Sequence, residues 1–173
     1  MPDARADLLD RIVAEVASGG LGDRSLRDIA AAVGSSHRML LYHFGSRAGL
    51  VAAIVESVES AQRALLRELA ADAGDARSLV MALWDRVSSP ELRPFVRLFF
   101  ETVAATGGDG DRLTSPWLED ARQAGDLVGA DLDPVEVRLG VAVVRGLLID
   151  VLATGDAEPA TAALRRFADR WYG

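Results

Sequence analysis

Residues 25–50 combine short helical patterns with the signals that start and stop helices, and no other stretch constrains the fold as strongly. Ser25 and Asp28 form an S-x-x-D capping pattern, which places a hydroxyl and a carboxylate at the start of a helix. Gly34 interrupts the apolar stripe that follows, and Ser35 and Ser36 offer a new N-cap directly after it. Two short helices joined by such a tight turn indicate a helix-turn-helix.

The second short helix of this stretch carries few core positions and many contact side chains. Leu40 and Phe44 stand four residues apart, and we expect both to face the core. Ser46 then caps a long helix that begins near Arg47. The side chains expected to point outward or partly outward are His37, Arg38, Met39, Tyr42 and His43. A second helix rich in exposed contact residues is typical of a DNA-reading helix-turn-helix.

The spacing of these anchors resembles the N-terminal domain of the tetracycline-repressor (TetR) family. The residues in register are Ile29, Ala30, Gly34, Leu40, His43, Phe44, Ser46, Arg47 and Leu50. The detailed match covers about residues 5–55, and the rest of the chain matches in size and helical character. Leu41 stands where the family usually has tyrosine, and Met39 stands where it usually has threonine. The resemblance implies a homodimeric regulator of transcription, more specifically a repressor that a small-molecule effector releases from palindromic double-stranded DNA.

The helix-turn-helix supplies the candidate DNA contacts. Arg38 can donate two hydrogen bonds to a guanine or pair with a phosphate, with a solvated surface arginine as the alternative. For His43, packing and phosphate contact are both open. By resemblance, Ser25 and Arg47 match the phosphate-contacting positions of the family. The expected DNA-binding set is Ser25, Arg27, Ser36, His37, Arg38, Met39, Tyr42, His43 and Arg47.

The charge distribution is compatible with DNA binding although the total is not. The chain has a formal net charge of −7. Residues 24–50 nevertheless hold four arginines and one aspartate, a sum of +3. A basic face on an acidic body is what a DNA-docking domain attached to a regulatory domain would show.

The remaining sequence predicts further helices with no convincing strand. An apolar stripe predicts a helix over residues 4–18, and a second stripe predicts a continuous helix from residue 47 to about 73. That second stripe consists of Leu50, Ile54, Val58, Ala61, Leu65 and Leu69. Asp75 can cap the next helix. Ser89-Pro90, Ser115-Pro116 and Asp133-Pro134 each have the form of an N-cap followed by proline in the first turn.

Glycines predict where several of these helices end. Stops are expected at Gly107-Gly108, near Gly125 and at Gly155, with a loop over residues 107–112. The last two helices are expected over residues 134–154 and 158–171. The prediction is an all-α chain of about nine helices. Residues 1–50 would form the DNA-binding domain, and residues 51–173 a helical regulatory domain for ligand binding and dimerisation.

The C-terminal half offers a candidate ligand pocket and a candidate dimer interface. Its aromatic residues are core residues in the simplest interpretation, but TetR-like proteins bind effectors in this region. The expected pocket set is Trp84, Phe95, Phe99, Phe100, Glu101, Trp117 and Arg145. The helix over 134–154 is apolar on nearly all sides, so one flank can face its own domain and the other a second subunit. The expected dimer set is Val137, Val141, Val144, Leu148, Val151, Leu164, Phe167 and Trp171.

Enzymatic and metal-dependent functions find little support in the sequence. The chain has no cysteine, and its two histidines, His37 and His43, point about 120° apart on one helix, so they form a poor metal pair. No cofactor, metal or catalytic residue is predicted. We expect no signal peptide and no membrane span, and we expect a cytoplasmic location. The alternative is a ligand-binding or protein-interaction helical protein whose helix-turn-helix no longer reads DNA. The salt dependence of DNA affinity distinguishes the two.

Overall fold

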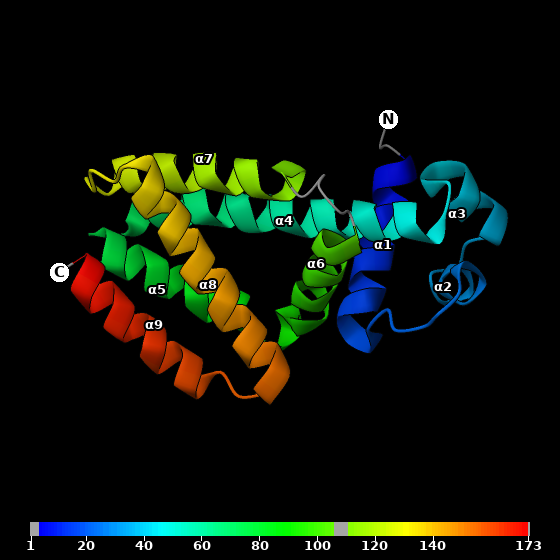
Figure 1. Ribbon diagram of the computed structural model, residues 1–173. Helices are drawn as coiled ribbons and strands as arrows, with labels where there is room; N and C mark the ends of the chain where they lie inside the picture. The colour runs from blue at the N-terminus through cyan, green and yellow to red at the C-terminus, as the bar shows by residue number, and fades with distance from the viewer. Residues whose placement is uncertain (1–3, 106–110, 173) are drawn as a thin grey trace.

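The computed structural model describes residues 4–105 and 111–172, and in this part of the chain it contains nine α-helices, one short 3-10 turn and no strand (Figure 1). The α-helices are α1 (Ala4–Gly19), α2 (Leu26–Ala32), α3 (His37–Phe44), α4 (Arg47–Asp72), α5 (Ala76–Val87), α6 (Arg93–Ala105), α7 (Asp111–Leu127), α8 (Pro134–Thr154) and α9 (Glu158–Trp171). The 3-10 turn is η1 (Pro90–Leu92). The predicted all-α class is confirmed.

The predicted capping residues set the start of α2 and α3. The Ser25 hydroxyl accepts a hydrogen bond from the Asp28 N–H, and the Asp28 carboxylate accepts one from the Ser25 N–H at 2.9 Å. Ser36 accepts from the Met39 N–H at 3.2 Å and so caps α3. Between them Gly34 has a φ of +63°, a conformation that glycine adopts without steric cost. These contacts confirm the helix-turn-helix.

Helix α4 joins two apolar cores and extends along most of the molecule (Figure 1). Its 26 residues span about 39 Å at 1.5 Å per residue. Leu50 and Ile54 in its first half pack with α1, α2 and α3. Leu66 and Ala70 in its second half pack with α5, α7, α8 and α9. The same rigid helix therefore belongs to both ends of the protein.

Helix α6 lies between these two ends and contributes to the N-terminal core. Phe95, Leu98 and Phe99 are buried in one cluster with residues of α1 and α4. The expected boundary after residue 50 falls within α4, and apolar packing continues across it through α4 and α6.

Helix α7 begins earlier than predicted. Ser115-Pro116 does not start it, because the helix already begins at Asp111 and Pro116 lies inside. Proline lacks the N–H that would bond to the carbonyl of residue 112, but packing of α7 along α4 outweighs this loss. The helix also continues past the predicted stop near Gly125, to Leu127. The predicted stop at Gly107-Gly108 and residues 107–110 of the predicted loop lie outside the described residues.

Helix α8 starts and ends where the sequence predicted. Asp133 and Glu136 form a capping box around Pro134, and Gly155 ends the helix with a φ of +76°. The seam chosen for the dimer interface faces inward instead, which corrects that prediction. Val137, Val151 and the α9 residue Leu164 are 6%, 2% and 0% exposed within the single chain, so they are not available to a partner.

Candidate functional site

The outer face of α3 exposes an unusual group of large side chains. Tyr42 is 79% exposed, and the neighbouring Met39 and Leu41 are 41% and 40% exposed. Arg38 is also exposed on this helix, whereas Leu40 and Phe44 are buried behind it. Only Leu40 and Phe44 of the eight residues of α3 are buried, so the opposite side of the helix is available for contact.

The arginines near this face divide into two groups. Four of them make contacts inside the domain, and these are Arg5, Arg11, Arg24 and Arg47. Arg11 donates to the Val33 carbonyl at the end of α2 at 2.9 Å, and Arg24 pairs with Glu15 at 2.9 Å. Arg27 and Arg38, in contrast, make no hydrogen bond or ion pair within residues 4–105 and 111–172. These two guanidinium groups are free to meet an anionic ligand.

The other residues expected to contact DNA are already engaged locally to different degrees. Arg47 donates to the carbonyls of Gly22 and Arg24, the latter at 3.1 Å, and so holds the segment that leads into α2. The hydroxyls of Ser25 and Ser36 serve as helix caps. His37 and His43 are half-buried, and the His43 ring lies edge-on to Tyr42 at 5.0 Å.

A second candidate site is a largely apolar cavity of about 140 Å³ in the C-terminal half. Helices α4, α5, α6, α7 and α8 line it. Five residues of the expected pocket set form part of the wall, and these are Phe95, Phe99, Phe100, Trp117 and Arg145. The other two lie elsewhere. Trp84 is fully buried and donates to the Thr161 hydroxyl at 2.7 Å, and Glu101 is exposed and lines a different depression.

The expected dimer residues of α8 also contribute to this wall. Val141, Val144 and Leu148 line the cavity together with the buried Val137. Of the α9 residues, Phe167 is half-buried and stacks on Trp171 with ring centroids 5.5 Å apart, and Trp171 is 41% exposed.

Sequence reasoning missed three polar residues of the cavity wall, Glu59, Gln62 and Tyr172. Gln62 had a detectable signal, because it continues the four-residue spacing of Val58 and Leu66 on the inward side of α4. Tyr172 follows α9, and its hydroxyl would lie 3.1 Å from a Cβ at residue 140, so Gly140 allows its close approach.

Two charged groups of the cavity are perturbed by burial. Burial raises the pKa of the Glu59 carboxyl, and the indole N–H of Trp117, which donates to it, opposes this shift. Burial lowers the pKa of the Arg145 guanidinium. Arg145 donates to the Thr114 hydroxyl and the Leu113 carbonyl, both at 3.0 Å, and lies 4.9 Å from the Phe99 ring centroid.

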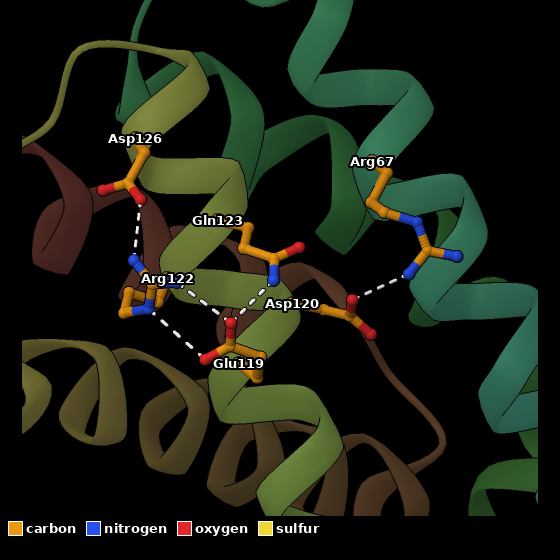
Figure 2. Close-up of polar contacts among 6 residues, drawn as sticks. All are labelled: Arg67, Glu119, Asp120, Arg122, Gln123 and Asp126. Carbon is orange, nitrogen blue, oxygen red and sulfur yellow. Dashed lines mark hydrogen bonds and ion pairs between the residues drawn. The ribbon is translucent and has the colours of Figure 1, made fainter.

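Polar contacts fix α7, which carries one wall of the cavity, against α4. Asp120 pairs with Arg67 at 2.7 Å, as Figure 2 shows, and with Arg63 at 3.2 Å. On the outer side of α7, Arg122 joins Glu119 and Asp126 in a surface chain of ion pairs (Figure 2). Trp117, which lies on α7 and lines the cavity, is therefore held in a fixed position.

The comparison with known families concerns the helix-turn-helix end of the molecule. Residues 8–54 match the family model described as bacterial regulatory proteins, tetR family. The N-terminal domain of this chain is thus similar to that of TetR-family proteins. The match contains α1, α2, α3 and the start of α4, and so includes the exposed α3 face. None of the curated proteins matches the sequence.

Solved structures of TetR-family proteins share the fold over nearly the whole chain. A TetR-family transcriptional regulator from Pectobacterium atrosepticum has a TM-score of 0.80 at 22% identity, over 96% of this chain and 90% of that one. The multidrug binding protein EbrR, complexed with imidazole, has a TM-score of 0.70 at 21% identity, over 100% and 92%. SmeT, the repressor of the Stenotrophomonas maltophilia multidrug efflux pump SmeDEF, has a TM-score of 0.68 at 20% identity, over 99% and 91%.

The described part of this TetR-like chain holds no cluster of three or more histidine or acidic side chains that could bind a metal ion. No helix in residues 4–105 and 111–172 is both long and apolar enough to cross a bilayer.

Proposed function

We propose that the chain is a sequence-specific DNA-binding transcriptional regulator. The observation that carries this proposal is the α3 face, where Arg38 is unpaired and Tyr42 is 79% exposed on a TetR-family helix-turn-helix. In this proposal α3 enters the major groove, Arg38 donates to guanine or phosphate, and Arg27 binds the backbone. Residues 1–50 act as the DNA-binding domain and residues 51–173 as the regulatory domain.

The regulator acts as a homodimer in this proposal. Because the inward seam of α8 is occupied by its own domain, the partner would meet the opposite face. That face exposes Val135, Ala142, Gly146, Ile149 and Ala153, with Val135 73% and Ile149 51% exposed. Trp171 of α9 would lie at its edge. Two α3 helices in one dimer would read half-sites about 34 Å apart in a palindromic operator.

A small-molecule effector bound in the cavity would release the DNA, which makes the protein a repressor. Two proteins of similar fold support this role, since SmeT is a repressor and EbrR is a multidrug binding protein. Support within this chain comes from α6, whose Phe95 and Phe99 belong both to the cavity wall and to the N-terminal core. A ligand that prefers one position of α6 would shift the population of α3 spacings.

The experiment is fluorescence anisotropy of the purified protein on labelled duplexes that tile the DNA flanking its own gene, at two salt concentrations. We expect tight, salt-sensitive binding to one tile. Equal and weak binding to every tile would contradict the proposal if selection from a random duplex library also yielded no preferred sequence.

Two arginine variants sharpen this experiment. Arg38→Ala should weaken binding to the preferred tile by about 1–3 kcal/mol and reduce its preference over other tiles. Arg86→Ala, an exposed arginine on α5, is the matched control and should leave the affinity unchanged. Equal effects of the two variants would remove Arg38 from the DNA-contacting set.

A further inference from the structure

Two hydrogen-bond acceptors lie one helical turn apart on the cavity wall. Glu59 and Gln62 both project from α4 into the cavity, whose other lining is mostly aliphatic and aromatic. The Gln62 side-chain oxygen is buried and has no hydrogen-bond partner. A buried acceptor without a partner is unfavourable, and proteins keep few of them. The cavity thus presents a vacant acceptor beside a carboxylate.

The two charged groups of this cavity, both half-buried, are not paired with each other. Arg145 directs its guanidinium to the Thr114 hydroxyl, the Leu113 carbonyl and the face of Phe99. Within the part of the chain that the structure describes, no ion pair links Arg145 to Glu59. The Glu59 carboxylate receives one neutral donor, the indole N–H of Trp117. The Arg145 guanidinium therefore has several partners, whereas the Glu59 carboxylate can accept a further hydrogen bond.

We propose that the cavity binds a largely apolar organic cation whose protonated amine donates hydrogen bonds to the Glu59 carboxylate and the Gln62 side-chain oxygen. This deepens the proposed function and rests on the cavity being the effector site. A cation is favoured over a neutral donor because charge-assisted hydrogen bonds are stronger and a buried carboxylate gains most from a positive partner. A cavity of about 150 Å³ can hold benzene. The present volume of about 140 Å³ is similar, so the apolar part of the ligand should be about the size of one aromatic ring.

The proposal predicts how binding depends on pH. Arg145 on α8 and Arg63 on α4, itself paired with Asp120, are the charged groups that act on Glu59. Burial raises the pKa of Glu59 in the free protein, and a bound ammonium group would lower it. Affinity for an amine should therefore rise as the pH increases through the pKa of Glu59. A neutral ligand of the same shape should show no such rise.

Isothermal titration calorimetry on the full chain without DNA tests the ligand class. Three probes share one ring and differ in charge, namely 2-phenylethylamine, 2-phenylethanol and phenylacetate. We expect the amine to bind roughly tenfold more tightly than the alcohol, or better, since tenfold corresponds to the strength of one good polar contact. Phenylacetate should bind most weakly. Since no DNA is present, failure of DNA binding leaves this result unaffected.

Matched variants assign the effect to the two acceptors. Glu59→Gln keeps an acceptor for Trp117 and should cost the amine roughly tenfold in affinity, with the alcohol within about twofold and the pH dependence lost. Glu56→Gln, on the exposed side of α4, should change nothing. Gln62→Leu should weaken the amine as well and serves if Glu59→Gln does not fold.

Several results would overturn the proposal. Tighter binding of phenylacetate than of the amine would make Arg145 the anchor and an anion the ligand. Equal affinities for amine and alcohol, or no binding of any probe, would equally exclude the organic cation. A Glu59→Gln variant that binds the amine as the wild type does would remove the carboxylate from the site.

Discussion

Replacement of Gln62 by leucine should make the protein more stable, which is the opposite of what most substitutions at inward positions do. Gln62 occupies the inward stripe of α4 between Val58 and Leu66, and its buried oxygen has no partner. An unpaired buried acceptor costs about 1–3 kcal/mol. Leucine removes that cost, keeps a similar volume and adds apolar contact with the cavity wall.

We therefore expect Gln62→Leu to raise the free energy of unfolding by about 1–3 kcal/mol. For a chain of this size, a change of 1 kcal/mol shifts the melting temperature by about 2–4 °C, so the increase should be roughly 2–12 °C. Urea unfolding followed by circular dichroism measures the free energy. Protomer concentration must be held fixed, because an associating protein gains stability with concentration.

Gln123→Leu is the matched control for this substitution. Gln123 lies on the outer side of α7, where its amide donates to Glu119 at 2.6 Å (Figure 2). An exposed change of this kind should alter stability by no more than about 0.5 kcal/mol. A Gln62→Leu protein that is less stable than the wild type, with an unchanged denaturant slope, would refute the interpretation of Gln62 as a residue kept for ligand binding at the expense of stability.

Three further predictions concern other parts of the molecule. Pro116→Ala should raise stability by about 1 kcal/mol in the same urea assay, because it restores one backbone hydrogen bond inside α7, and a loss would contradict this. Since the pKa of Glu59 is raised above 4.5, the stability that its protonated form contributes is present below that pH and is lost as the pH rises through the folded-state pKa. Glu59→Gln should thus gain stability relative to the wild type as the pH rises from 4.5 through the folded-state pKa of Glu59, and a constant difference would argue against the raised pKa. Ile149→Arg should shift the protein from dimer to monomer in sedimentation equilibrium, whereas an unchanged dimer would exclude this face of α8.

Local signals in the sequence were sufficient for the helix-turn-helix and for most helix ends. Ser25, Ser36 and Asp133 act as caps through contacts within three residues of themselves, so the sequence carries the whole interaction. Pro116 shows where this reasoning stops. A serine followed by proline is a good helix start, but the earlier turn makes contacts with residues distant in sequence. Leu113 packs against the N-terminal core, and its carbonyl accepts a hydrogen bond from Arg145 of α8.

The sites depended on side-chain directions that periodicity could not resolve. Helix α8 is apolar on both flanks, so its sequence does not indicate which flank faces the core, and the prediction assigned the inward flank to the partner subunit. On α4 the prediction placed Ala61 on the inward side after Val58. Ala61 is exposed, and the inward side continues from Val58 through Gln62 to Leu66. Which of two adjacent residues faces inward depends on what α5 and α7 place against the helix.

Helix α6 contributes both to the cavity wall and to the N-terminal core, and this limits how ligand preference can change in evolution. Phe95 and Phe99 line the cavity and also belong to the core that holds α1 and α4 in place. A mutation that reshapes the cavity from this side would destabilise the helix-turn-helix end as well. Residues such as Val141 and Val144 on α8 line the cavity without belonging to that core. We therefore expect ligand preference to change by substitutions on α8, while the cavity-lining residues of α6 stay the same.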